Sequence, residues 1–321
     1  MPTRSRGLFT ATVAANRPLC REHFSLILAL PEFPPTAAGQ FVQLMCSEAD
    51  AGDLVDTEWN PGEKPPVFCD ELAKPQAVLR RPFSLAGRKD VAGGVELEII
   101  HRVVGIGTQW LSELKIGDEV GVLGPLGNQF TPPPADGSAI FVGGGVGIPP
   151  MLYLADQWAN QPAVAFAGAL TRDLLPMRLT QAASASAEPL ACVGEFADCG
   201  IESVIATDDG SEGYRGYVTA ALEMYLDQHL PKRAARFRKP TIYTCGPELM
   251  MKRVAAIALE RGLPCQVAVE RAMACGMGTC QSCCIRVKKA DASLPPLVGQ
   301  DWCYRLACTD GPVFQAADLL W

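Results

Sequence analysis

The sequence predicts three domains: an antiparallel β-barrel over residues 1–134, a doubly wound α/β domain over 135–262, and a small cysteine-rich domain over 263–321. In the first part, short β-branched and aromatic segments are separated by glycine and proline turns. From about Ser138, strand-like and helix-like segments alternate, which is typical of a parallel sheet. Closely spaced cysteines follow in the last part. These three observations give a multidomain fold.

The barrel strands are expected where apolar residues recur between turn residues. They cover residues 8–15, 24–30, 40–45, 95–103 and 119–123. Residues 47–76 are rich in Asp, Glu, Gly and Pro. Because such a segment adds little to a core, we expect a surface loop there.

The first candidate site in the barrel is Arg81-Pro82-Phe83-Ser84. A guanidinium can pair with two phosphate oxygens, and the serine hydroxyl can reach polar atoms of a cofactor ring. A solvated turn would account for the same residues. The motif alone therefore leaves both interpretations open.

The second candidate site is a predicted strand that ends in Ile100-His101-Arg102 and leads through Gly107 and Thr108 into a helix over 109–114. We expect Thr108 to cap this helix. The free amides at the start of a helix form a favourable site for an anion. A strand, turn and helix without a ligand remains the alternative.

A glycine-rich turn marks the start of the second domain. Residues 139–142 are apolar and predict a buried strand, which leads into Gly143, Gly144, Gly145 and Gly147 and then a helix over 149–158. Glycines allow the close backbone approach that a pyrophosphate needs. The dinucleotide fingerprint G-x-G-x-x-G fails at its last position, because Ile148 stands there.

Further strands are expected at 163–167, 203–206 and 241–244, with helices at 219–229 and 248–261. Cys245-Gly246-Pro247 directly follows the last of these strands. Ligands of open α/β sheets bind at the carboxyl ends of the strands, so this motif is a candidate for nucleotide contact. A small buried thiol is the alternative interpretation of Cys245.

The most informative pattern is Cys275, Cys280, Cys283 and the more distant Cys308. This C-x4-C-x2-C…C spacing is typical of a plant-type 2Fe–2S site. Structural zinc usually needs two C-x2-C pairs, whereas this region has one. Cys303 competes with Cys308 as the fourth ligand, and Cys284 adjoins Cys283; we choose Cys308 and leave the other two without a role.

Composition excludes several other classes. The chain has 321 residues, 48% of them hydrophobic, and a formal net charge of -7, so nucleic acid is not an expected partner. The most apolar segment, residues 139–152, is interrupted by glycines and prolines, and we expect no membrane-spanning helix. The chain is too long for a disulfide scaffold, and its 13 cysteines indicate a reducing, cytoplasmic location.

Taken in order, the motifs resemble those of the ferredoxin reductase superfamily. Within it, residues 270–280 and 307–314 are similar to the electron transfer subunits of class 1B dihydroorotate dehydrogenase, as is Thr207-Asp208-Asp209-Gly210-Ser211. The resemblance covers almost the whole chain. Three segments are longer than in that family: residues 47–76, the interval from Cys283 to Cys308, and the loop over 183–200.

The resemblance implies one cofactor for each domain: FAD in 1–134, NAD in 135–262 and 2Fe–2S in 263–321. The residues at the FAD positions are Arg81, Pro82, Phe83, Ser84, Ile100, His101, Arg102, Gly107 and Thr108. Those at the NAD positions are Gly143, Gly144, Gly145, Gly147, Cys245, Gly246 and Pro247, and those at the cluster positions are Cys275, Cys280, Cys283 and Cys308.

The resemblance also implies a function. Electrons from dihydroorotate would pass from the FMN of a separate catalytic subunit through the 2Fe–2S cluster and FAD to NAD⁺, in the synthesis of UMP. We expect an assembly of two plus two subunits and no catalytic acid or base in this chain.

Other functions stay open. One is an NAD(P)H-dependent flavin and iron–sulfur reductase that serves a ferredoxin or an oxygenase. A related one is the small subunit of an NADPH-dependent ferredoxin oxidoreductase, whose cluster loop has a carboxylate where this chain has Cys275. A third is a binding module without enzymatic activity in which the cysteines hold zinc. The choice between NAD and NADP is also open.

Overall fold

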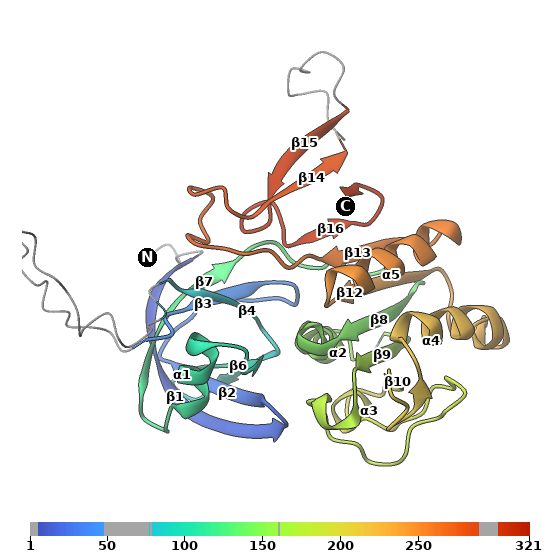
Figure 1. Ribbon diagram of the computed structural model, residues 1–321, viewed down its shortest axis with the longest axis horizontal. Coiled ribbons are helices and arrows are strands. Elements are labelled where there is room, and N and C mark those ends of the chain that lie inside the picture. The colour runs from blue at the N-terminus through green and yellow to red at the C-terminus, as the bar shows by residue number, and fades with distance from the viewer. Residues whose placement is uncertain (1–5, 48–76, 78, 160, 289–300) are drawn as a thin grey trace, which may run out of the picture.

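The computed structural model describes residues 6–47, 77, 79–159, 161–288 and 301–321. In this part of the chain, two seven-stranded sheets and one three-stranded sheet form. Figure 1 shows the two large sheets side by side, with the small one above their junction. This arrangement agrees with the predicted barrel, α/β domain and cysteine-rich domain.

The first sheet is antiparallel and has the strand order β4-β3-β7-β1-β2-β6-β5. The strands predicted in this region are confirmed, and β4 and β5 are additional. Pro82 lies in β4, which is an edge strand, where a residue without an N–H group is tolerated. The predicted surface loop, apart from Ser47, lies outside the described residues. The strands are β1 (Gly7–Cys20), β2 (His23–Leu30), β3 (Phe41–Leu44), β4 (Arg81–Ser84), β5 (Gly87–Val91), β6 (Gly94–Arg102) and β7 (Glu119–Leu126).

The second sheet has the order β11-β10-β9-β8-β12-β13-β16 and is parallel except for β16. The strands predicted here are confirmed, while β11, β13 and β16 were not predicted. The strands are β8 (Ser138–Gly144), β9 (Ala163–Ala169), β10 (Glu202–Thr207), β11 (Tyr214–Arg215), β12 (Pro240–Cys245), β13 (Cys265–Ala268) and β16 (Val313–Gln315).

Helices cover both faces of this sheet, as in a doubly wound fold. Buried residues of α2 and α3 pack in the same core as the barrel, whereas those of α4 and α5 form a second core on the other face. The predicted helix over 219–229 corresponds to α4 and a π-helical turn, Tyr225–His229, and the prediction over 248–261 to α5. The α-helices are α1 (Ile106–Glu113), α2 (Ile148–Gln157), α3 (Gly194–Ala197), α4 (Val218–Met224) and α5 (Glu248–Glu260); 3₁₀ turns cover Gly145–Gly147, Arg172–Leu174 and Pro231–Arg233.

The C-terminal part of the chain joins the second sheet at two points. Strand β13 begins after residue 262 and pairs with β12, and β16 then pairs with β13. The sheet therefore extends beyond the domain boundary expected from the sequence. The third sheet, β15-β14-β17, stands apart from it and consists of β14 (Cys284–Lys288), β15 (Trp302–Leu306) and β17 (Leu319–Leu320).

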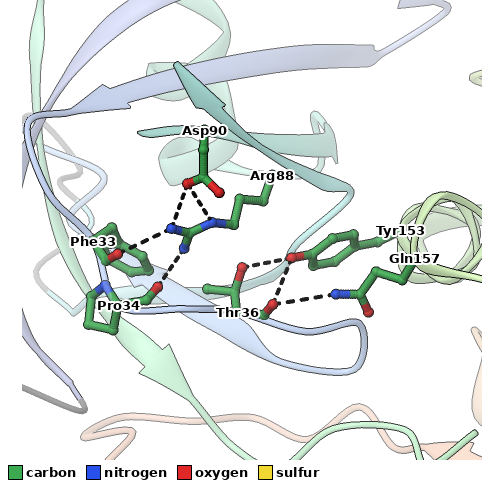
Figure 2. A network of polar contacts seen from close by, with 7 residues as sticks. All are labelled: Phe33, Pro34, Thr36, Arg88, Asp90, Tyr153 and Gln157. Atoms are coloured by element: carbon green, nitrogen blue, oxygen red, sulfur yellow. Dashed lines mark hydrogen bonds and ion pairs between the residues drawn. The ribbon is translucent and has the colours of Figure 1, made fainter. Parts of the chain in front are cut away.

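A polar network joins the barrel to helix α2 (Figure 2). The hydroxyl of Tyr153 lies 2.7 Å from Thr36 Oγ1 and donates to the Thr36 carbonyl oxygen at 3.0 Å. Gln157 accepts from the amide of Ala38 at 2.9 Å. Arg88 holds the same barrel loop through the Pro34 carbonyl oxygen. Because α2 follows the glycine-rich turn directly, this network fixes that turn relative to the barrel.

Tyr153→Phe tests this connection. The ring is 2% exposed, so the substitution keeps the packing and removes only the hydroxyl that serves Thr36. We expect a loss of about 1 to 2 kcal/mol in the free energy of unfolding, measured in urea. Tyr217→Phe is the control, because Tyr217 is 69% exposed. Equal stability of the Tyr153 variant and the wild type would contradict the role given to the hydroxyl.

Candidate functional site

A cavity of about 830 Å³ opens where the barrel, the second sheet and the segment after β13 meet. This volume suits a large cofactor. The barrel contributes β4, the end of β6 and the start of α1, and the second sheet contributes residues at the carboxyl ends of β8 and β12. The predicted residues that line the cavity are Arg81, Pro82, Phe83, Ser84, Ile100, His101, Arg102, Gly107, Thr108, Gly147, Cys245 and Gly246.

Arginine supplies the positive charge of the cavity. Arg102 is paired with Glu22 at 2.7 Å, so its charge is partly neutralised. Arg81 donates to the Leu79 carbonyl oxygen at 2.9 Å, and no carboxylate among the described residues pairs with it. Arg81 is therefore the better placed of the two for a phosphate group.

The structure corrects the predicted role of Thr108. Helix α1 begins at Ile106, two residues before Thr108, so Thr108 is not its N-cap. Its Oγ1 accepts from the amides of Val104 at 2.9 Å and Gly105 at 3.2 Å, and donates to the Gly105 carbonyl oxygen. Thr108 therefore closes the turn before the helix and lines the cavity.

His101 carries two buried ring nitrogens that have no hydrogen-bond partner among the residues that the structure describes. The residue is 2% exposed and stacks on Phe24, with 5.8 Å between ring centroids, while Phe83 packs edge-on at 6.1 Å. Burial, with a smaller contribution from His23, lowers the pKa of His101 to about 4. A neutral, buried imidazole in the cavity wall, together with the ring of Phe83, gives this side of the cavity an uncharged aromatic surface that fits a planar ring such as flavin.

The glycine-rich turn and the segment after β12 pack directly against each other. A Cβ on Gly147 would collide with the backbone of Cys245 and Gly246, and one on Gly144 would lie 3.3 Å from Pro247. Gly147, Cys245 and Gly246 line the cavity; the predicted residues Gly143, Gly144, Gly145 and Pro247 do not. Burial, with the nearby charge of Glu270, raises the pKa of Cys245 to about 12, so its thiol stays protonated.

The four predicted cluster cysteines lie near one another. The amide of Cys280 donates to Cys275 Sγ at 3.4 Å, and the thiols of Cys283 and Cys308 interact. Gly276 and Gly278 have φ angles of 67° and 87°, a conformation that favours glycine, and they allow the loop to turn around the thiols. In the described part of the chain, no three His, Cys, Asp or Glu side chains converge on a single metal ion. A centre of two irons bridged by sulfides spreads its thiolate ligands further apart than a single ion does.

The surroundings shift the pKa values of two of these thiols in opposite directions. A hydrogen bond with the Ser282 hydroxyl, at 3.2 Å, is the main cause that lowers the pKa of Cys280 to about 6, whereas burial raises that of Cys308 to about 11. Cys284 and Cys303 belong to the β14–β15 hairpin, and the Cys284 thiol donates to the Gln281 carbonyl oxygen at 2.7 Å.

The segment after β13 also forms part of the cavity wall, which no motif in the sequence predicted. Ala268, Val269, Glu270, Arg271, Ala272 and Met273 line the cavity, and Cys275 follows two residues later. Their position in the sequence could have predicted this role, because these residues join β13, the strand next to β12, to Cys275. One continuous segment therefore connects the cavity to the cysteine loop.

Comparisons with known proteins agree with this geometry. Residues 270–320 match the family model of the iron–sulfur cluster binding domain of dihydroorotate dehydrogenase B, and residues 141–256 match the oxidoreductase NAD-binding domain. A solved structure of an NADH-dependent reduced ferredoxin–NADP oxidoreductase is 25% identical, with a TM-score of 0.68 over 97% of this chain and 90% of that chain. Fold and site thus define an oxidoreductase of the ferredoxin reductase type.

Two curated relatives narrow the class. The electron transfer subunit of dihydroorotate dehydrogenase B (NAD⁺) from Desulforamulus reducens is 34% identical, covering 85% of this chain and 91% of the relative. The corresponding subunit from Geobacillus thermodenitrificans is 36% identical, covering 84% of this chain and 90% of the relative. The chain belongs to the family of dihydroorotate dehydrogenase B electron transfer subunits.

The pKa of His101 gives a pH prediction for the cofactor-free protein. The folded-state pKa lies below the ordinary value of 6.5, so the unfolded chain takes up a proton first as the pH falls. Stability should therefore fall from pH 6.5 towards pH 4, and His101 should account for about 2 to 3 kcal/mol of the loss.

The His101→Phe variant checks this by urea unfolding at pH 7 and pH 4.5. The variant should lose less stability between the two pH values than the wild type does. Some loss should remain, because burial also lowers the pKa of His23. An unchanged loss in the variant would contradict the assignment to His101.

The four-thiolate interpretation predicts different results for different cysteines. Cys280→Ser should abolish the visible absorbance of the cluster and the paramagnetic signal of its reduced form, because the iron loses a soft ligand. Cys284→Ser and Cys303→Ser are the controls and should keep both signals. Loss of the cluster in the Cys303 variant, with retention in a Cys308→Ser variant, would show that the fourth ligand is misassigned.

Proposed function

We propose that this chain passes electrons from a separate FMN-containing subunit, through a 2Fe–2S cluster and FAD, to NAD⁺, and that dihydroorotate is the source of these electrons. The observation that carries the proposal is the continuous segment from Ala268 to Met273, which lines the cavity and leads into the cysteine loop. Membership in the family supports the same direction of transfer.

For FAD, we propose the barrel side of the cavity. Arg81 provides a guanidinium that no carboxylate of the described residues pairs with, and His101 provides a neutral, buried part of the wall beside the flavin ring. Gly107 lets the start of α1 pack closely against Cys46, because a Cβ on Gly107 would lie 3.1 Å from the Cβ of Cys46. The other proposed contacts are Pro82, Phe83, Ser84, Ile100, Arg102 and Thr108.

For NAD, we propose the carboxyl ends of β8 and β12. Gly147, Cys245 and Gly246 line the cavity there, and their close packing supports a site formed by the backbone. The protonated thiol of Cys245 presents a small uncharged group at this position. Gly143, Gly144, Gly145 and Pro247 would shape the turn from behind, without lining the cavity.

For the cluster, we propose Cys275, Cys280, Cys283 and Cys308 as ligands. A bound flavin exchanges two electrons as hydride with nicotinamide and single electrons with an iron–sulfur cluster. The residues of this chain bind and orient the cofactors: amides of the cysteine loop donate to Cys275 Sγ, and the Ser282 hydroxyl bonds with Cys280.

We further propose the domain limits 1–134, 135–262 and 263–321, with β13 and β16 as the strands that attach the last domain to the second sheet. The catalytic partner would bind beside the cysteine loop, where Met277 is 54% exposed. We propose an assembly of two plus two subunits in the cytoplasm. No helix in the described part of the chain is long and apolar enough to cross a membrane.

Isolated and mixed subunits test the function. Alone, the reconstituted chain should oxidise NADH with an artificial electron acceptor and show no turnover of dihydroorotate, because the proposal assigns that substrate to the partner. Addition of the cognate FMN subunit should produce NAD⁺ reduction that depends on dihydroorotate, measured at 340 nm. Dihydroorotate turnover by the chain alone would contradict the two-subunit proposal. Transfer only to a ferredoxin or an oxygenase would favour the alternative reductase.

A further inference from the structure

Gln43 occupies a position between the flavin motif and the cysteine loop. It lies in β3, where it pairs with Pro82 of β4 on one side and with Leu123 of β7 on the other. Side chains alternate along a strand, so Gln43 shares a face with Phe41, which lines the cavity, while Val42 and Leu44 face the barrel core. The Phe41 face packs in the same core as Cys283 and Cys308.

The Gln43 amide is fully buried. The residue is 0% exposed, and Nε2 lies 3.4 Å from the carbonyl oxygen of Ala274, the residue before Cys275. Its Oε1 has no hydrogen-bond partner within the described part of the chain. A Cβ placed on Gly276 would lie 2.7 Å from Oε1, so the amide touches the cysteine loop on both sides of Cys275.

The burial of this amide lowers the stability of the fold. Its neighbours along and across the sheet are Phe41, Pro82 and Leu123, and an unpaired buried acceptor in such surroundings costs about 1 to 3 kcal/mol. An apolar side chain of similar size would fill the same space without that cost. The contact with the cysteine loop is what distinguishes glutamine from such a residue.

A second barrel amide holds the other ligand segment. Asn128 donates through Nδ2 to the carbonyl oxygens of Asp310 and Val313, and its Oδ1 accepts from the amide of Val313 at 2.9 Å. These bonds fix the chain just after Cys308. The segment around Cys275 has Gln43 as its corresponding barrel contact.

We propose that Gln43 is a positioning residue for the cluster: its amide holds the loop around Cys275 at a fixed place relative to the flavin motif on the neighbouring strand. The inference rests on the proposed function in assigning the cluster and the flavin to these two places. The contact itself concerns only residues of this chain, so it can be tested separately from cofactor binding.

The first test is hydrogen exchange over residues 274–280 in the full-length Gln43→Met variant. Methionine keeps the volume and removes the amide. Loss of one hydrogen bond should speed exchange in this loop about fivefold, while the thermal stability is unchanged or higher because the unpaired oxygen is gone. Gln40→Met is the matched control: Gln40 bonds to Ala37 and Gly127 and makes no hydrogen bond to this loop. Equal exchange in wild type and Gln43→Met would overturn the proposal.

The second test is the midpoint potential of the cluster, followed by its paramagnetic signal during a redox titration. The partial negative charge of Oε1 beside the loop disfavours the addition of an electron, so Gln43→Met should raise the potential and favour reduction about two- to fivefold. The potential should stay unchanged in Gln40→Met. A merely structural role for Gln43 would leave the potential unchanged, and that result would overturn the proposal. A wild-type chain that binds no cluster would instead defeat the proposed function, and the exchange experiment would still decide the contact.

Discussion

The packing of the segment after β13 against the barrel is the constraint on which the rest of the structure depends. The amide of Val269 donates to the Pro312 carbonyl oxygen at 2.9 Å, which ties this segment to the chain beyond Cys308. A few residues on, Gly276 is buried against Gln43 and Leu126 of the barrel. These contacts bring Cys275 and Cys308 to one side of the barrel. The residues between β13 and Cys275 line the cavity there.

The charges in the cavity follow from the same packing. Burial keeps His101 and Cys245 uncharged, and Arg102 is paired with Glu22, so Arg81 is the cavity arginine whose charge is not paired within the described residues. Glu270 and Arg271 also line the cavity, and Arg271 is paired with Glu248 at 2.9 Å. A phosphate would therefore meet its strongest attraction on the barrel side, whereas the side that we propose for nicotinamide is formed by glycine backbone and a neutral thiol.

The main strands and the cysteine loop could be predicted because the sequence patterns that indicate them are local. Short β-branched, aromatic or apolar runs between turn residues predicted the main strands of both sheets, and the spacing of Cys275, Cys280 and Cys283 predicted one loop with three thiols. Features that depend on distant partners were missed. Thr108 looked like a cap because hydroxyl residues favour that position, but the helix begins earlier, and the hydroxyl bonds with Val104 and Gly105. Strand β16 is three residues long and forms only because β13 offers it an edge. Nothing in the local sequence marks Gln43, since its significance comes from a loop more than 200 residues away.

Reduction of the isolated, reconstituted chain by NADH tests the central claim most directly, because that claim places nicotinamide, flavin and cluster sites in contact within one chain. The account predicts one FAD, two irons and two sulfides per chain, and it predicts that anaerobic NADH bleaches both the flavin and the cluster absorbance without any partner. A chain that binds FAD but no iron, or one in which NADH reduces the flavin while the cluster stays oxidised at every NADH concentration, would contradict it.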